Sequence, residues 1–442
     1  MKEKGILLPI FSLPTKYGIG DFGSEAYEFI DILSENKIDY WQVLPINASN
    51  RSPYATKSYY ALNERFISLD KLKEQGLIKE PKTRDKTNTA IYDDFKEKYY
   101  KEAYNNFKKN DEYKNFIKCE EIIEYAKFMS GNDKKEEYYL FLQYILYKQW
   151  MELKKYANLK NVKIIGDLPI YPNFDSCETK FHSKYYEMEN GDFKYSAGMP
   201  PDDYNQNGQI WETPVYNISN LKKDNYSYFI KRFKFYKKLF DKIRVDHFIG
   251  FDRFYKIPIG KKAVEGHFEN GVSYDFFDEL FKYKDITPDD LLVEDLGGNI
   301  KDSTIRLREY YDFTRQKPLQ MSIDLDKYFD IDNSGGKVMV FPGNHDFHTI
   351  VGWYKSLNDL YKERLKEFLR RNDCLDDDIS KSVINYCLKS NASLVVVSAQ
   401  DILGLDDSSR INIPGTVSDR NWSWKLIDFN EFRNRIKIFK ER

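Results

Sequence analysis

Short apolar segments recur along this chain and are separated by stretches with helical periodicity. Eight of them are rich in strand-forming residues and lie at residues 5–10, 39–46, 162–170, 242–248, 291–297, 319–323, 337–342 and 393–399. Strands that are buried on both faces read as continuous apolar runs, and their alternation with helices is typical of a parallel sheet. The sequence therefore predicts an α/β fold, and eight such units predict a (β/α)8 TIM barrel.

Two long stretches interrupt this alternation. Residues 71–157 are rich in Lys, Glu and Asn and carry long helical patterns, so we expect a helical insertion after the second strand. Its clearest helix covers 137–156, with an apolar stripe through Leu140, Tyr144, Tyr147 and Met151. A second insertion, a loop at about 171–225, follows the third strand. No linker separates another domain, so we expect residues 1–442 to form a single catalytic barrel.

Composition excludes several classes of partner. The 69 basic and 70 acidic residues give a formal net charge of -1, which provides no attraction for nucleic acid or anionic membranes. The cysteines and histidines have no metal-type spacing, and we expect no metal and no cofactor. No stretch is long and apolar enough for a signal peptide or a membrane span, so the sequence predicts a soluble, cytoplasmic protein. The sequence does not indicate an oligomeric state.

Acidic residues follow four of the predicted strands. They are Asp167 after KIIG, Asp246 after IRV, Glu294 after LLV and Asp346 after GNH. In barrels of this kind, catalytic groups lie at the carboxyl ends of the strands. One such acid is more often a helix cap or half of an ion pair, but four on one rim favour chemistry. Paired carboxylates are what glycosidic-bond cleavage needs, one as nucleophile or charge stabiliser and one as proton donor.

The segment KIRVDHFIG at 242–250 carries the densest set of polar groups. Because residues two apart on a strand face the same way, Arg244 and Asp246 are expected on one side. The guanidinium should keep the carboxylate ionised, which suits a nucleophile, although a structural ion pair is the alternative. His247 and His345 lie beside two of the acids, and hydrogen bonds to sugar hydroxyls are the expected use of both.

Several motifs resemble one known family. IRVDHFIGF, LLVEDLGG and FPGNHDFHTIVGW resemble the catalytic-strand motifs of amylomaltases, the 4-α-glucanotransferases of glycoside hydrolase family 77. The segments AGMPPDDYNQNGQIWETPVY and AQDILGLDDSSRINIPGT are similar to family segments in family order, and the resemblance covers roughly residues 5–426.

The resemblance implies a role for each matching residue. Asp246 would be the nucleophile and Glu294 the general acid/base, while Asp346 would hold sugar hydroxyls as the ring distorts. The same subsite would be lined by Asp167, Arg244, His247 and His345. Tyr54 would stack on the sugar there, Trp211 would lie toward the acceptor, and Tyr204 offers a second stacking face in that loop. The implied partners are a maltodextrin, or another α-1,4-glucan, as donor and as acceptor.

The chain also departs from the family pattern. Ile249 replaces a common arginine, Phe347-His348 replaces Asn-Asp, and Asn344 replaces a threonine. Two other functions remain open from the sequence. One is an α-glucan hydrolase with the same residues, in which water completes the reaction, and the other is a non-catalytic glucan-binding barrel.

Overall fold

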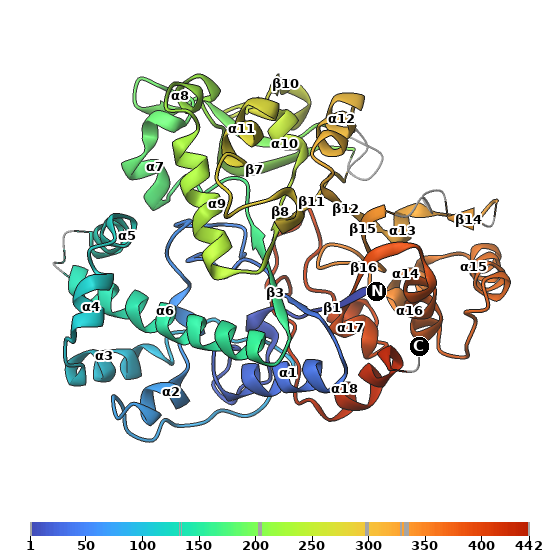
Figure 1. Cartoon of the computed structure of the whole chain (residues 1–442), viewed down its shortest axis with the longest axis horizontal. Coiled ribbons are helices and arrows are strands. Elements are labelled where there is room, and N and C mark those ends of the chain that lie inside the picture. The colour runs from blue at the N-terminus through green and yellow to red at the C-terminus, as the bar shows by residue number, and fades with distance from the viewer. Residues whose placement is uncertain are drawn as a thin grey trace.

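The computed structural model describes residues 2–131, 133, 135–201, 206–296, 300–327, 329–330 and 336–440. A closed barrel of parallel strands forms its centre (Figure 1). Around the barrel the strands follow the order β1-β16-β15-β12-β11-β8-β3-β2. Their bounds are Glu3–Leu7 (β1), Tyr40–Gln42 (β2), Lys163–Leu168 (β3), Lys242–Val245 (β8), Leu291–Val293 (β11), Thr314–Pro318 (β12), Gly336–Phe341 (β15) and Ala392–Ser398 (β16). The predicted (β/α)8 barrel is confirmed.

Seven of the eight strands lie where the apolar runs predict them, and the sixth does not. The run at 319–323 begins with helix α13 (Leu319–Ser322), and the barrel strand is the preceding β12. The sequence of β12 is TRQKP, which does not read as an apolar strand. Its polar side chains are nevertheless buried, Gln316 at 3% and Lys317 at 5% exposure. Hydrophobicity therefore gave the wrong position for this strand.

The region between β2 and β3 is helical. It contains α2 (Leu69–Glu74), α3 (Glu97–Asn106), α4 (Asp111–Phe116), α5 (Glu120–Ser130) and α6 (Glu136–Leu159). Figure 1 shows these helices together on one side of the barrel. Helices α3, α4 and α5 each contact α6, and α6 contacts β3 and α1 (Ser24–Glu35). We propose on this basis that they form one insertion subdomain anchored through α6.

The buried face of α6 differs from the predicted stripe. Trp150 and Leu153 are fully buried, whereas Met151 is 41% exposed. Tyr144 is buried as predicted, and Leu140 and Tyr147 are partly buried. The predicted stripe follows one row of helical neighbours. Because α6 packs on the barrel on one side and on other helices on another, its buried face is wider than that row.

A second sheet lies beside the barrel. It has the strand order β10-β9-β6-β7. Its strands are β6 (Tyr195–Met199), β7 (Gln209–Pro214), β9 (Arg253–Pro258) and β10 (His267–Asn270). The chain positions of β6 and β7 fall in the predicted loop insertion, while β9 and β10 follow β8. Among the described residues, β7 is therefore an edge strand that pairs with β6 on one side only.

The remaining strands and α-helices are short or cover the outside of the barrel. They are β4 (Met188–Glu189), β5 (Asp192–Phe193), β13 (Ile323–Asp324), β14 (Phe329–Asp330), α7 (Cys177–Phe181), α8 (Ile218–Lys223), α9 (Ser227–Leu239), α10 (Ile249–Asp252), α11 (Ser273–Leu280), α12 (Asp302–Tyr310), α14 (Ile350–Ser356), α15 (Asp359–Arg371), α16 (Ile379–Lys389), α17 (Ala399–Ile402) and α18 (Asn430–Arg435). No helix in the described ranges is long and apolar enough to cross a membrane.

Gly166 of β3 permits a close contact behind the barrel rim. A Cβ atom at this position would lie 2.2 Å from the ring of Phe240. That ring is buried and packs edge-on against Trp150, so it has no room to move away. We expect Gly166→Ala to lower the free energy of unfolding by about 1–3 kcal/mol, as overpacking typically does. Urea unfolding measures this, with Lys163→Ala at an exposed position of the same strand as control. Equal stability of the two variants would contradict the packing argument.

Candidate active site

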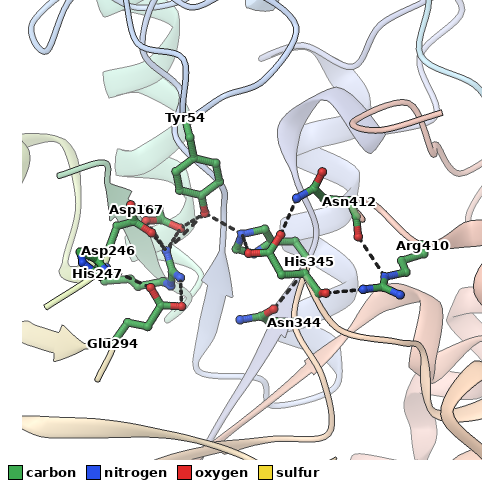
Figure 2. A network of polar contacts seen from close by, with 11 residues as sticks. Tyr54, Asp167, Asp246, His247, Glu294, Asn344, His345, Arg410 and Asn412 are labelled. Atoms are coloured by element: carbon green, nitrogen blue, oxygen red, sulfur yellow. Dashed lines mark hydrogen bonds and ion pairs between the residues drawn. The ribbon is translucent and has the colours of Figure 1, made fainter. Parts of the chain in front are cut away.

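A buried arginine organises the carboxyl ends of three neighbouring strands. Arg244 on β8 is 1% exposed, and its register places it opposite Asp167 on β3. Its Nη1 atom donates to both carboxylate oxygens of Asp167 at 2.8 Å and to Asp246 Oδ1 at 3.1 Å. Its Nη2 atom lies 2.6 Å from Glu294 Oε1, beyond the end of β11. One planar group thus contacts three of the four predicted acids (Figure 2).

This arrangement explains how a charged group is tolerated in the barrel. Burial alone lowers the pKa of Arg244, but Asp167 and Glu294 raise it well above its usual range, so the guanidinium stays charged. A buried charge is costly unless it is paired and hydrogen-bonded. Asp167 is completely buried, whereas Asp246 and Glu294 keep side-chain exposures of 22% and 16%. The last two therefore face the space that a substrate can reach.

The cluster holds more negative than positive charge. Burial raises the pKa of Asp246 well above its usual range, Arg244 acts in the opposite direction, and the neighbouring carboxylates add to the increase. Burial also raises the pKa of Asp167. Arg244 does favour the ionised form of Asp246, as the sequence predicts, but burial outweighs it. Asp246 and Asp167 consequently retain their protons more readily than isolated carboxyl groups would.

Tyr54 connects the two halves of the cluster. Its hydroxyl donates to Asp167 Oδ2 at 2.7 Å and lies 2.9 Å from His345 Nε2. Its ring stacks on the His345 ring, with centroids 5.3 Å apart. Burial and the nearby Asp167 raise the pKa of Tyr54 well above its usual range, so the phenol is neutral. Figure 2 shows Tyr54 between the Asp167 side and the His345 side of the network.

Asp346 is held by a separate set of donors. Asn412 Nδ2 donates to its Oδ1 at 2.6 Å, and His345 Nε2 lies 3.3 Å from its Oδ2. Its backbone N–H donates to Asn344 Oδ1, and its carbonyl accepts from Arg410 Nη2 at 2.5 Å. Burial acts to raise the pKa of Asp346, but His345 and Asn412 outweigh it and lower the value to about 2. Asp346 is therefore an ionised carboxylate at neutral pH.

His247 links Glu294 to the second sheet. Its φ of 47° lies in the left-handed region, which costs energy for a residue other than glycine. This conformation directs its backbone N–H to Glu294 Oε2 at 3.0 Å. The His247 ring meets the Trp211 ring edge to face, with centroids 4.8 Å apart. Burial lowers the pKa of His247 to about 4, so the imidazole is neutral at physiological pH.

We expect His247 to make stability depend on pH between about 4 and 6.5. In this window the unfolded chain binds a proton at His247 and the folded protein does not, so the free energy of unfolding falls as the pH is lowered. The loss is at most about 3 kcal/mol. Asn tolerates the left-handed conformation without titrating, so His247→Asn should show a shallower slope in urea unfolding at a series of pH values. His267→Asn on β10 is the matched control, and an unchanged slope for His247→Asn would refute the assignment.

The structure brings all nine predicted site residues into one connected region. Sequence reasoning missed Asn412 and Arg410 as site residues, although both lie in a segment that resembles the family. The signal for them was the segment RINIPG, in which Arg410 and Asn412 alternate with two isoleucines before Pro-Gly. Tyr204 lies outside the described residues. Among the substituted positions, Ile249 is buried at the start of α10, and His348 pairs with Asp407 at 2.5 Å.

No group of three or more His, Cys, Asp or Glu side chains is arranged to hold a metal ion in the part of the chain that the structure describes.

Comparison with known proteins identifies the family. The sequence profile of glycoside hydrolase family 77, described as 4-alpha-glucanotransferase, matches residues 8–137 and 124–429. A 4-alpha-glucanotransferase from Aquifex aeolicus is 31% identical, over 99% of this chain and 98% of the relative. One from a Synechocystis species is 33% identical, over 95% of this chain and 93% of the relative.

Solved structures agree with these sequence matches. An amylomaltase from Streptococcus agalactiae, solved in complex with acarbose, superposes with a TM-score of 0.93 at 27% identity. That alignment covers 100% of this chain and 98% of the other. Neither the hydrolase nor the non-catalytic alternative is favoured by these similarities. The chain therefore belongs to the 4-alpha-glucanotransferases of glycoside hydrolase family 77.

Proposed function

We propose that the chain transfers α-1,4-glucan segments between maltodextrins by a retaining double displacement, with Asp246 as nucleophile and Glu294 as acid/base. The observation that carries these roles is that two nitrogens of one guanidinium contact both carboxylates. Retaining enzymes use such a pair of carboxylates on one site, one as the nucleophile and one as the acid/base.

The first step uses the ionised form of Asp246, which Arg244 favours against the effect of burial on its pKa, and this carboxylate attacks the anomeric carbon of the donor sugar. The bond to the glycosidic oxygen breaks, and Glu294 gives that oxygen its proton, so the shortened glucan leaves with a free 4-hydroxyl. The 4-hydroxyl of an acceptor then attacks the same carbon, Glu294 takes its proton, and the ester to Asp246 breaks. Two inversions preserve the α configuration.

The other residues bind and orient the sugar. Asp346, ionised and held by Asn412, accepts hydrogen bonds from sugar hydroxyls. Neutral His247 and the ring of His345 offer hydrogen-bonding nitrogens to the same sugar ring. Arg244 contacts the nucleophile and Asp167 contacts Arg244, and both side chains are buried, so we assign them a positioning role.

Trp211 is proposed to hold the acceptor. Transfer prevails over hydrolysis only if the protein orients an acceptor, and well-oriented groups reach effective molarities of ~10⁵ M or more. Trp211 is half-buried on β7 and contacts the neutral ring of His247, which places an aromatic face beside the proposed acid/base. Aromatic faces suit the apolar sides of sugar rings.

The product pattern from maltotriose tests this proposal. We expect the wild-type protein to form glucose and a ladder of longer glucans, with little net gain of reducing ends. Trp211→Ala should raise the hydrolytic share of turnover, while Trp211→Phe should keep most of the transfer. Chromatography by chain length with a reducing-end assay measures both. A steady rise of reducing ends in the wild type, without products longer than maltotriose, would make the protein a hydrolase.

A further inference from the structure

A groove outside the active site lies against the second sheet. Its volume is about 480 Å³, within the range of small-ligand sites. The residues that matter for its chemistry are Asn173, Phe174, Ile210, Glu212, Ile259 and Lys261. None of them belongs to the Arg244 cluster, and the reaction described above uses none of them.

The groove and the active site lie on opposite faces of one strand. The pairing of β7 with β6 is irregular between Ile210 and Pro214, so the contacts of each side chain define the two faces here. On β7, Trp211 contacts His247 and Tyr171, on the side of the catalytic cluster. Its neighbours Ile210 and Glu212 line the groove. Because β7 is the edge strand of its sheet, a linear ligand can pass around its unpaired edge from one face to the other.

The lining combines apolar surfaces with polar groups at the rim. Ile210 and Ile259 are 46% and 52% exposed, so both present an aliphatic surface to solvent. The half-buried ring of Phe174 packs against the ring of Phe193, with centroids 4.9 Å apart. Asn173, Glu212 and Lys261 supply hydrogen-bonding groups, and the two charged ones have opposite sign. A neutral ligand with apolar faces and hydroxyl edges matches this lining, and a sugar chain is such a ligand.

Backbone strain is also present at this place. Glu212 has a φ of 54°, in the left-handed region, although it lies inside a β-strand and is exposed to solvent. Strained residues of this kind gather at ligand sites, where the surrounding structure holds them. Here the strained residue connects the Trp211 face with the groove face of β7.

We propose that the groove binds a distal segment of the same α-1,4-glucan whose reacting end occupies the active site. This inference rests on the proposed function for the identity of the ligand. A glucan long enough to pass around the edge of β7 contacts both places, whereas maltotriose fills only the active site. The groove therefore selects for long chains without taking part in bond cleavage.

The test compares long and short substrates in groove variants. Ile259→Asp removes an exposed apolar contact with little risk to folding, and Phe174→Ala removes the ring platform. Leu360→Asp, at a 58% exposed position of α15, is the matched control. For each groove variant we expect the KM for amylose to rise about five- to tenfold, the scale of one lost apolar contact. For maltotriose we expect KM and kcat to stay at the wild-type values.

Direct binding separates this inference from the proposed function. Asp246→Asn protein, titrated with maltoheptaose in a calorimeter, should bind the glucan more tightly than the same protein carrying Ile259→Asp. Equal affinity of the two proteins, or an unchanged KM for amylose, would overturn the groove proposal. Equal losses on amylose and maltotriose would also overturn it, because the variants would then act on the catalytic centre. Failure of the wild type to lengthen maltotriose would instead refute the proposed function. The product assay that shows this is separate from the binding titration.

Discussion

Asp246→Ala is expected to lower kcat for transfer from maltotriose by about 10⁴-fold or more, on the scale seen when a covalent nucleophile is removed. The physical reason is that no other carboxylate can replace it. Asp167 is completely buried against Arg244, and Asp346 is held by Asn412 and His345. Initial rates measured by glucose release give the effect, and circular dichroism and urea unfolding check that the variant is folded.

A chemical rescue makes this prediction sharper. With α-glucosyl fluoride as donor, added azide can occupy the space that the missing carboxylate leaves and attack the anomeric carbon once. A single displacement inverts the configuration, so the expected product is β-glucosyl azide. Retention of more than a small fraction of wild-type activity without azide would show that Asp246 is not the nucleophile. An α-configured azide from this variant would lead to the same conclusion.

Glu294→Gln is expected to reduce transfer from maltotriose by about 10²–10⁴-fold, the usual contribution of a general acid/base. The effect should depend on the leaving group. Fluoride needs little protonation, so the variant should still form the glycosyl-enzyme from α-glucosyl fluoride. Azide should then intercept that intermediate and give α-glucosyl azide, since two displacements retain the configuration. The opposite anomers from the two variants distinguish the nucleophile from the acid/base.

The role of Glu294 is decided by how much activity Glu294→Gln loses with maltotriose and how much it loses with the fluoride. Mass spectrometry of the trapped protein should find the sugar on the peptide that contains Asp246. If Glu294→Gln lost activity equally with maltotriose and with the fluoride, a general structural effect would explain the result better than proton transfer. The matched control is Glu309→Gln on α12, at an exposed position of the following helix.

The sequence predicted the barrel because most of its strands are buried on both faces. β16 is the clearest case, since Val395, Val396 and Val397 are all buried and form one continuous apolar run. The apolar pattern gave the wrong position for β12 because this strand is buried but its side chains are polar. The side-chain amide of its buried Gln316 donates to Leu292 O on the neighbouring strand β11, and local hydrophobicity does not report such a hydrogen bond.

The site shows a similar division between local pattern and spatial arrangement. The positions of the acids at strand ends follow from the pattern, and so does the shared side of Arg244 and Asp246. The contact between Arg244 and Glu294 does not, because it depends on the register between β8 and β11. Likewise, the balance of charge that raises the pKa of Asp246 depends on burial and on three strands meeting, which no single segment contains.

The closure of the barrel has a consequence for how the protein is made. β1 pairs with β16, and Lys2 Nζ donates to Leu388 O, a group 386 residues further along the chain. Contacts of such long sequence separation form slowly, since a large loop must close before they contribute. During synthesis β1 can pair with β2 early, but its other edge stays open until β16 has left the ribosome. The nascent chain therefore leaves one edge of β1 open to pairing with other strands for most of its synthesis.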